Sequence, residues 1–145
     1  MQQSTSPAKE LLLPGVQFNT CPIGASIGIL GRKWTLLILR DIGFFKTNRF
    51  NQILHVTPGL TPRVLSMRLH ELEKTGFIKR VNGSKSAREV YWALTEKGRD
   101  VLPILLKFIE FGAKWHADKV FEDKEPRTLQ EIFLQKELRP YLKHY

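Results

Sequence analysis

One stretch of the chain, residues 61–94, restricts the fold more than any other part of the sequence. It reads TPRVLSMRLHELEKTGFIKRVNGSKSAREVYWAL. Thr61 is a favoured helix N-cap, and the proline that follows it suits the first helical position. An apolar stripe at spacings of four and three residues comes next, formed by Leu65, Leu69 and Leu72. Gly76 then provides a stop, so we predict an amphipathic helix over residues 61–75.

The residues that follow Gly76 predict a β-hairpin. Phe77–Val81 and Glu89–Leu94 each alternate apolar and polar side chains, which is the pattern of a half-buried strand. The segment between them, NGSKSAR, begins with Asn82-Gly83, a pair that favours tight turns. The whole stretch therefore predicts a helix, a glycine stop and a hairpin with a basic tip.

The rest of the chain predicts further helices, which gives an α+β fold that is mainly α. Hydrophobic spacing, caps and turns place them at about residues 20–30, 34–42, 49–56, 96–117 and 127–138. Thr20 is the expected cap of the first helix, and Pro103 and Gly112 are expected to bend or weaken the fourth. The second is apolar on nearly every side, which indicates a buried central helix. We divide the chain into a flexible N-terminal arm, a winged domain and a helical extension that serves dimerisation, at residues 1–17, 18–118 and 119–145.

Positive charge is concentrated around the helix and the hairpin. The 145 residues include 23 Lys/Arg and 14 Asp/Glu, which gives a formal net charge of +9. Residues 32–99 hold fourteen of the basic and five of the acidic residues, whereas the nine of each kind elsewhere cancel. Solubility alone does not predict this concentration. A local positive field predicts affinity for phosphate that weakens as salt increases.

The sequence argues against several other classes of protein. No apolar run approaches the roughly 18 residues of a membrane span, and the first residues lack the pattern of a signal peptide. The single Cys21 excludes an internal disulfide and a cysteine-built zinc site. The four histidines form no metal-spaced pair, and there is no phosphate loop or nucleophile motif. We therefore expect a cytoplasmic protein without a cofactor that is not an enzyme.

The order of the elements is that of a winged helix-turn-helix, in which the second helix enters the major groove of DNA. A short helix and a turn at residues 57–60 precede helix 61–75, and the basic hairpin, or wing, follows it. An ordinary exposed helix also carries Arg, Ser, His and Lys, so the order of elements decides for DNA binding. The predicted contacts of the recognition helix are Thr61, Pro62, Arg63, Ser66, Met67, Arg68 and His70. Arg63 can pair bidentately with guanine, whereas Arg68 lies at the side of the helix and suits a phosphate.

The predicted contacts of the wing surround the tip of the hairpin. They are Arg80, Asn82, Lys85, Ser86 and Arg88. A hairpin tip without a binding role is also polar and often basic, but arginine is attracted to narrow DNA grooves. Arg88 at the base of the tip is the strongest candidate, because its position there restricts its movement.

Two further features each allow two interpretations. Cys21 is either a small buried hydrophobe, which we favour, or a reactive thiol at the positive end of a helix, which would make it a redox sensor or an intersubunit disulfide partner. An aromatic set in the C-terminal third could line a small-molecule pocket, but we favour the seam of a homodimer. The set comprises Phe108, Phe111, Trp115, Phe121 and Phe133.

Four pieces of the sequence also follow one another in a specific order. They are CPIGASIGILGRKWTLLILRDI, RFNQIL, PGLTPRVLSMRLHELEKTGFIKR and YWALTEKGRDVLPIL. Together they resemble the HxlR-type transcription regulators, relatives of the MarR-type winged-helix proteins, from Cys21 to about Trp115. The resemblance implies a homodimer on operator DNA, with an interface built from the N- and C-terminal helices. It also implies that Cys21 matches a cysteine by which some members sense oxidants. The chain departs from the family pattern at Gly24, usually acidic, and at Arg32, usually glycine.

These observations predict a homodimeric transcription regulator that reads a roughly palindromic site in double-stranded DNA. A small-molecule or redox effector stays open at this point. Two alternatives also stay open, which are a non-specific architectural DNA-binding protein and a winged-helix module that binds other proteins. A ratio of specific to random DNA affinity near one would favour the first, and no binding to any duplex would favour the second.

Overall fold

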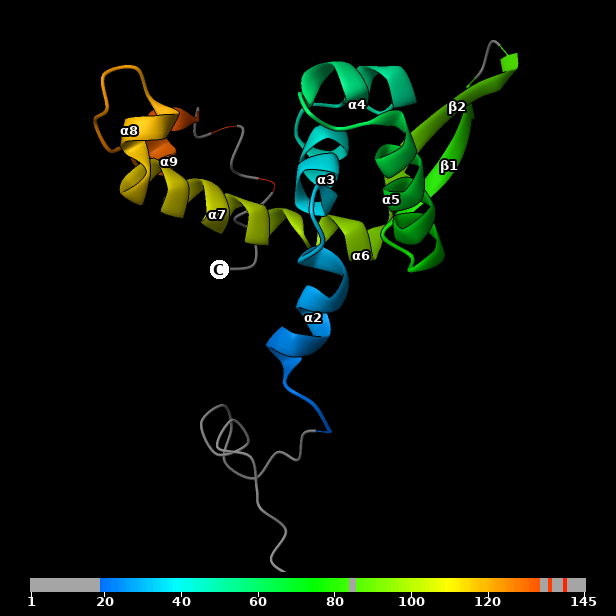
Figure 1. Cartoon of the computed structure of the whole chain (residues 1–145), viewed down its shortest axis with the longest axis horizontal. Helices are drawn as coiled ribbons and strands as arrows, with labels where there is room; N and C mark the ends of the chain where they lie inside the picture. Colours follow the sequence, from blue (N-terminus) through cyan, green and yellow to red (C-terminus); the bar gives the residue numbers. More distant parts are fainter. Residues whose placement is uncertain (1–18, 84–85, 134–135, 137–139, 141–145) are drawn as a thin grey trace, which may run out of the picture.

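The computed structural model of the chain describes residues 19–83, 86–133, 136 and 140, with side chains for all of these except residues 83 and 86–88. The fold is mainly helical, with a two-stranded antiparallel hairpin (Figure 1). In chain order the elements are α2 (Pro22–Leu30), α3 (Thr35–Gly43), α4 (Phe50–Val56), α5 (Pro62–Lys74), β1 (Ile78–Gly83), β2 (Ser86–Leu94), α6 (Glu96–Arg99), α7 (Leu102–Trp115), α8 (Ala117–Val120) and α9 (Leu129–Ile132).

The core forms around α3, as its apolar sequence predicts. Ile38 and Leu39 of this helix are completely buried, and they meet Ile53 of α4. The predicted stripe of α5 packs into the same core through Leu65, Leu69 and Leu72. α2 is different, because none of its residues is buried and the helix projects from the body of the molecule (Figure 1).

Local signals set both ends of α5. The Thr61 side chain accepts a hydrogen bond from the backbone N–H of Val64 at 3.3 Å, which confirms the predicted cap. Gly76 has a φ of +82°, a left-handed conformation that glycine adopts without strain, and it ends the helix as predicted. The backbone N–H of Phe77 then bonds back to the carbonyl of Leu72 at 2.8 Å. The chain therefore leaves α5 directly into β1.

The predicted hairpin is confirmed, and its strands extend further toward the tip than the alternating residues indicated. Ile78 pairs with Leu94 and Arg80 pairs with Trp92, with a shift in register between Asn82 and Gly83. The backbone N–H of Trp92 also donates to the carbonyl of Asn48 at 2.8 Å. This bond fastens the hairpin to the connection between α3 and α4.

Three predicted helix boundaries are wrong. The first helix begins after Cys21 rather than Thr20, because Pro22 takes the first helical position. The predicted helix 96–117 is split: α6 ends at Arg99, and α7 starts at Leu102 with Pro103 in its first turn. Proline lacks an N–H and clashes with the preceding turn, so it begins a new helix instead of bending the old one, whereas α7 continues through Gly112.

The predicted continuous helix 127–138 is also wrong, because it is interrupted at Phe133. It begins as the short α9, where the side chains of Thr128 and Glu131 make a capping box that sets the N-terminus at Leu129. Residues 134, 135, 137 and 138 of the predicted helix lie outside the described residues. Phe133 already has extended backbone angles, with φ −117° and ψ 145°. The N-terminal arm at residues 1–17 lies outside the described residues. None of the helices in the described ranges is long and apolar enough to cross a membrane.

Candidate nucleic-acid interface

The helix-turn-helix consists of α4, α5 and the turn between them. Thr57 and Leu60 are buried in this turn, and Gly59 between them has a φ of +89°. Since α5 buries its leucines, its opposite face is presented to solvent. That face carries the exposed side chains of Pro62, Arg63, Ser66, Met67, His70 and Lys74. The structure therefore places the predicted recognition residues on one surface, with the exception of Arg68.

Arg68 is held inside the protein by its own hydrogen bonds. Its side chain is 15% exposed, and its Nε donates to the backbone carbonyl of Lys33 at 2.9 Å. Its Nη1 donates to Glu71 at 3.1 Å, and Glu71 also accepts a hydrogen bond from Arg32. Arg68 thereby fastens α5 to the segment before α3. Arg63 differs, because it makes no hydrogen bond or ion pair with any residue that the structure describes.

The hairpin runs back along α5, so that its tip and the start of α5 lie toward the same end of the molecule (Figure 1). Asn82 is exposed near the tip. Of the other predicted wing residues, Lys85 lies outside the described residues, as do the side chains of Ser86 and Arg88. Arg80 lies lower on the hairpin, where its guanidinium covers the ring of Trp92 at 5.2 Å and pairs with Glu73 of α5 at 3.3 Å.

Carboxylates in the basic segment are mostly occupied by arginines. Four of the five acidic residues between positions 32 and 99 form ion pairs, with Arg32, Arg40, Arg49, Arg68 and Arg80 as their partners. The lysines of α5 and β1, Lys74 and Lys79, have no such partner in the described part of the chain. The surplus of positive charge is therefore carried by exposed lysines together with Arg63 and Arg99, neither of which pairs with a carboxylate of the described residues.

Helix α4 also presents exposed polar side chains, and these were not among the DNA contacts predicted from the sequence. Asn51, Gln52 and His55 are exposed on α4, the helix that precedes the turn. Arg49 at its N-terminus covers the ring of Tyr91 at 4.6 Å and lies 3.6 Å from Glu89. The first helix of a helix-turn-helix crosses the DNA backbone, so the polar residues Arg49, Asn51 and Gln52 at the start of this helix were the available signal.

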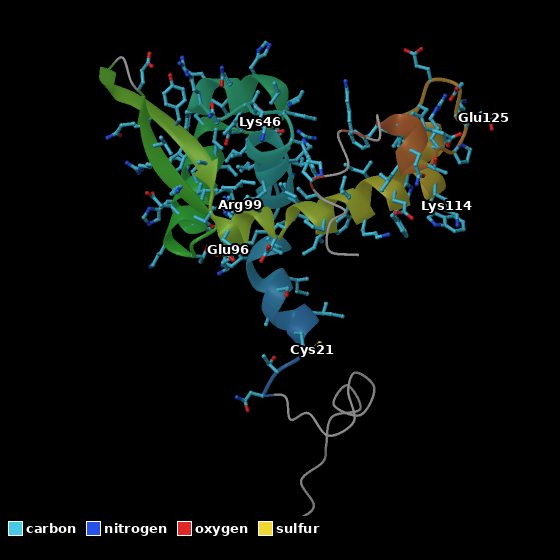
Figure 2. The ribbon with its side chains drawn as sticks, turned by 180° about the vertical axis from the view of Figure 1, so that it is seen from behind. Cys21, Lys46, Glu96, Arg99, Lys114 and Glu125 are labelled. Carbon is cyan, nitrogen blue, oxygen red and sulfur yellow. The ribbon has the colours of Figure 1, made fainter. Side chains whose placement is uncertain are left out.

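Cys21 lies at the N-terminus of α2, at the end of the helix that points away from the hairpin (Figure 2). It is a free, half-buried cysteine, and its carbonyl accepts a hydrogen bond from Ala25 at 2.9 Å. Its thiol is therefore remote from the recognition surface. Within the described ranges, no group of three or more His, Cys, Asp or Glu residues is arranged to hold a metal ion.

The predicted aromatic set is divided between two environments. Phe108, Phe111 and Trp115 are exposed on α7, at 58%, 57% and 64% respectively. Phe121 and Phe133 are half-buried beyond the end of that helix. Together with Ile104, which is also exposed, the residues of α7 are spaced by four, three and four positions and so form one stripe.

The helix-turn-helix, the adjacent hairpin and the exposed basic face of α5 define a winged helix-turn-helix protein of the DNA-binding class. Comparison with known proteins gives the family. The model of the HxlR-like helix-turn-helix family matches residues 29–120, which is more than half of the chain, so the chain belongs to that family. The protein is accordingly a DNA-binding transcriptional regulator of the HxlR/MarR type.

Individual relatives agree with this assignment. An uncharacterized HTH-type transcriptional regulator of Synechocystis sp. is 34% identical over 97 residues, which cover 67% of this chain and 71% of that protein. The crystal structure of PA1607, a putative transcription factor, is 28% identical with a TM-score of 0.62 and covers 76% and 72% of the two chains. The redox regulator HypR in its oxidized form is 31% identical with a TM-score of 0.53, over 63% and 94%.

Proposed function

We propose that the protein is a homodimeric regulator that recognises a specific, roughly palindromic operator. The observation that carries the proposal is the position of two unlike surfaces on one chain. The exposed face of α5 is polar and basic beside the hairpin, and the exposed face of α7 is apolar. The first suits a phosphate-lined groove, and the second suits another protein surface. Because a transcription regulator acts on genomic DNA, we also infer a cytoplasmic location.

The N-terminal half of α5 supplies the base contacts in this proposal. Arg63 donates to guanine, Ser66 bonds a base edge or phosphate, and Met67 contacts a thymine methyl group. Thr61, Pro62 and His70 flank these residues on the same helix. The wing residues Asn82, Lys85, Ser86 and Arg88 contact the backbone or the adjacent minor groove. Because Arg68 and Arg80 are held by internal partners, we assign them the positioning of α5 and of the hairpin.

Homodimer formation is supported by the apolar surface that α2 and α7 leave exposed. Ile23 and Ile27 of α2 are both exposed, and α2 buries no residue within its own chain. A groove between the two helices is lined by Pro22, Ile23, Ile27, Leu30, Ile104 and Phe108. Contiguous exposed apolar surface of this kind marks protein interfaces. A second copy related by a twofold axis would cover both grooves and set the spacing of the two α5 helices.

The experiment is selection of bound sequences from a random duplex pool, followed by affinity measurements on the selected and a scrambled duplex across a range of salt. We expect a specificity ratio of at least about 10³ at physiological salt. A ratio near one would replace the proposal with the architectural alternative. Failure to bind any duplex at low salt would replace it with the protein-interaction module.

We propose separately that the protein responds to oxidation through Cys21. The proposal is supported by the similarity of the chain to HypR, which is described as a redox regulator. Oxidation would link or alter the two α2 helices, and it would reach the recognition helices through the dimer. Diamide treatment followed by measurement of operator affinity tests it, with Cys21→Ser as the matched control. An equal response of the wild type and the Ser variant would exclude Cys21 as the sensor.

A further inference from the structure

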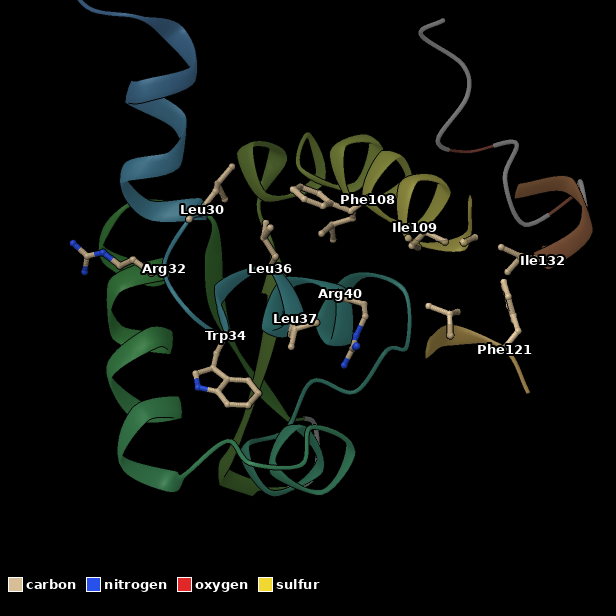
Figure 3. Close-up of a pocket in the computed structure, with 15 residues that line it drawn as sticks. Leu30, Arg32, Trp34, Leu36, Leu37, Arg40, Phe108, Ile109, Phe121 and Ile132 are labelled. Carbon is tan, nitrogen blue, oxygen red and sulfur yellow. The ribbon is translucent and has the colours of Figure 1, made fainter. Parts of the chain in front are cut away.

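A large cavity lies on the side of α3 away from the recognition helix, between α3, α7 and the segment that contains α8 and α9 (Figure 3). Its volume is about 710 Å³, which is within the range of about 300–1,000 Å³ of small-molecule sites. Its wall is almost entirely apolar, with Leu36, Leu37, Phe108, Ile109 and Phe121 among its side chains. Such a wall favours an apolar occupant of aromatic size.

Arg40 is a cation in this apolar wall, and one nitrogen of its guanidinium group is not used by hydrogen bonds within the described ranges. The Nε and Nη2 of Arg40 both donate to Asp41 Oδ1, at 2.8 and 2.7 Å, and the ring of Phe45 lies 4.8 Å from its guanidinium carbon. Its Nη1 has no acceptor among the residues that the structure describes. The other cation of the lining, Arg32, is paired with Glu71. Arg40 is therefore the group that can orient a ligand by an oxygen atom.

We propose that the cavity is an effector site for a small aromatic carboxylate. The aromatic ring would occupy the space between Leu37, Phe108 and Phe121, where apolar area is removed from water on both of its faces. The carboxylate would accept a charge-assisted hydrogen bond from Arg40 Nη1, which is the geometry in which guanidinium groups bind carboxylates.

The same wall is connected to the turn of the helix-turn-helix by two contacts. Asp41 is completely buried, and its Oδ2 accepts a hydrogen bond from Thr57 Oγ1 at 2.6 Å. Thr57 opens the turn that leads into α5. Trp34, which also lines the cavity, packs on that turn, because a Cβ at Gly59 would lie 3.2 Å from its ring.

These contacts give the ligand a route to the DNA-reading helix. A carboxylate bound at Nη1 pulls the guanidinium of Arg40 toward the cavity, and the Nε and Nη2 bonds transmit this pull to Asp41, which in turn holds Thr57. Movement of the Arg40–Asp41 pair shifts the turn and the start of α5, and ligand binding thereby changes DNA affinity. By linkage, operator DNA must change the affinity for the ligand by the same factor. This regulatory part rests on the proposed function, whereas ligand binding itself does not.

Calorimetry with 2-naphthoate tests the site directly, with the neutral 2-naphthamide as the matched ligand. We expect dissociation constants in the micromolar to low millimolar range, with naphthoate bound more tightly. Arg40→Met should weaken naphthoate by at least about tenfold and leave naphthamide nearly unchanged, because only the anion uses the guanidinium fully. Equal loss of both ligands, or no binding of either at millimolar concentration, would overturn the proposal.

Gly112 offers a way to fill the cavity without disturbing its wall. It lines the cavity, and a Cβ built on it meets no atom within 4 Å. Gly112→Leu should abolish naphthoate binding, while Gly112→Ala should retain it in a helix of equal or greater stability. Undiminished binding by the leucine variant would show that naphthoate binds elsewhere, for example on the exposed stripe of α7.

Coupling is tested by measuring operator affinity with and without saturating naphthoate. We expect a change of about 5- to 150-fold in the wild type, which is the usual range of coupling between two sites. Thr57→Val should bind naphthoate and lose most of this change, whereas Thr57→Ser, which keeps the hydroxyl, should retain it. Naphthoate that binds without altering operator affinity would refute the regulatory part alone. Loss of operator binding in the absence of ligand would instead refute the proposed function.

Discussion

The outer faces of α5 and α7 are built on the same helical repeat and differ completely in chemistry. Each helix buries leucines on its inner side, and α5 then presents Arg63, Ser66 and Met67 outward, where α7 presents Phe108 and Phe111. Hydrated polar groups exchange water for phosphate and base edges at little cost, whereas exposed aromatic rings gain free energy only when they are covered. The difference supports the proposal that the face of α5 contacts DNA and that the face of α7 contacts a second copy of the chain.

A second contrast exists among the arginines themselves. Arg32, Arg49, Arg68 and Arg80 each pair with a carboxylate and tie one element to another. The exposed pairs of Arg32, Arg49 and Arg80 contribute only about 0–1 kcal/mol each, so their value lies in fixing orientation, whereas the side chain of Arg68 is mostly buried. Arg63 forms no ion pair or hydrogen bond with any of the described residues. These four arginines therefore serve as structural ties, and Arg63 is left available for recognition.

The largest expected effect is on the apolar face of α7. Phe111→Glu would bury an unpaired charge in the proposed dimer interface, at a cost of about 3–5 kcal/mol, which raises the dimer Kd by at least about 100-fold. Phe111 does not line the cavity, so the variant leaves that site intact. Gln130→Glu on α9 adds the same charge at an exposed position and should leave the dimer unchanged. Sedimentation equilibrium measures both, and a monomeric wild type would contradict this prediction.

The next effect compares the two sides of α5. Leu69→Ala removes a side chain that is almost completely buried in the core, so the free energy of unfolding should fall by about 2–5 kcal/mol. Met67→Ala on the outer face should change it by less than about 0.5 kcal/mol and should still weaken operator binding. Urea denaturation measures the first quantity and fluorescence anisotropy the second. Comparable destabilisation by the two variants would show that Met67 packs against protein rather than solvent.

A smaller effect separates the recognition arginine from the positioning arginine. Arg63→Ala should weaken binding to the selected operator by about 1–3 kcal/mol and leave stability unchanged. Arg68→Ala should lower the free energy of unfolding by about 1–3 kcal/mol, because it leaves the carbonyl of Lys33 and the carboxylate of Glu71 without their partner. The two measurements are anisotropy and urea denaturation on the same samples. If Arg63→Ala lost affinity equally for scrambled DNA, its contact would be with a phosphate.

The accuracy of the sequence prediction follows the range of the interactions involved. α5 is predicted correctly because Thr61, its leucines and Gly76 all act within a few residues of each other. The role of Arg68 could not be predicted, since its partner Lys33 lies 35 positions away in sequence. The apolar run of α3, which covers nearly every side of the helix, predicts a buried central helix, yet Leu37 is exposed, because that side of the helix forms the wall of the cavity. The spacing of apolar residues identifies the apolar face of a helix, but only the assembled fold shows whether other side chains cover that face.

The smallest expected effect is a pH dependence at the far end of α7. Two hydrogen bonds from Arg127 lower the pKa of Asp123 from its usual value to about 2. The guanidinium of Arg127 also covers the ring of Phe121 at 4.4 Å, and its backbone N–H bonds to Ala113 of α7 at 3.3 Å. The Asp123–Arg127 pair therefore holds the segment with Phe121, one wall of the cavity, against α7.

The direction of the pH effect follows from the lowered pKa. A carboxyl group whose pKa is lower in the folded state contributes stability above its unfolded pKa and loses it as the pH falls through the folded value. The contribution of Asp123 should therefore be complete above about pH 4 and vanish toward pH 2. Because both groups are exposed, the change is local, so NMR titration of the Asp123 carboxyl and of the Phe121 ring is the suitable measurement. Asp123→Asn should remove the Phe121 transition, and an Asp123 titration near pH 4 would show that Arg127 does not hold this segment in solution.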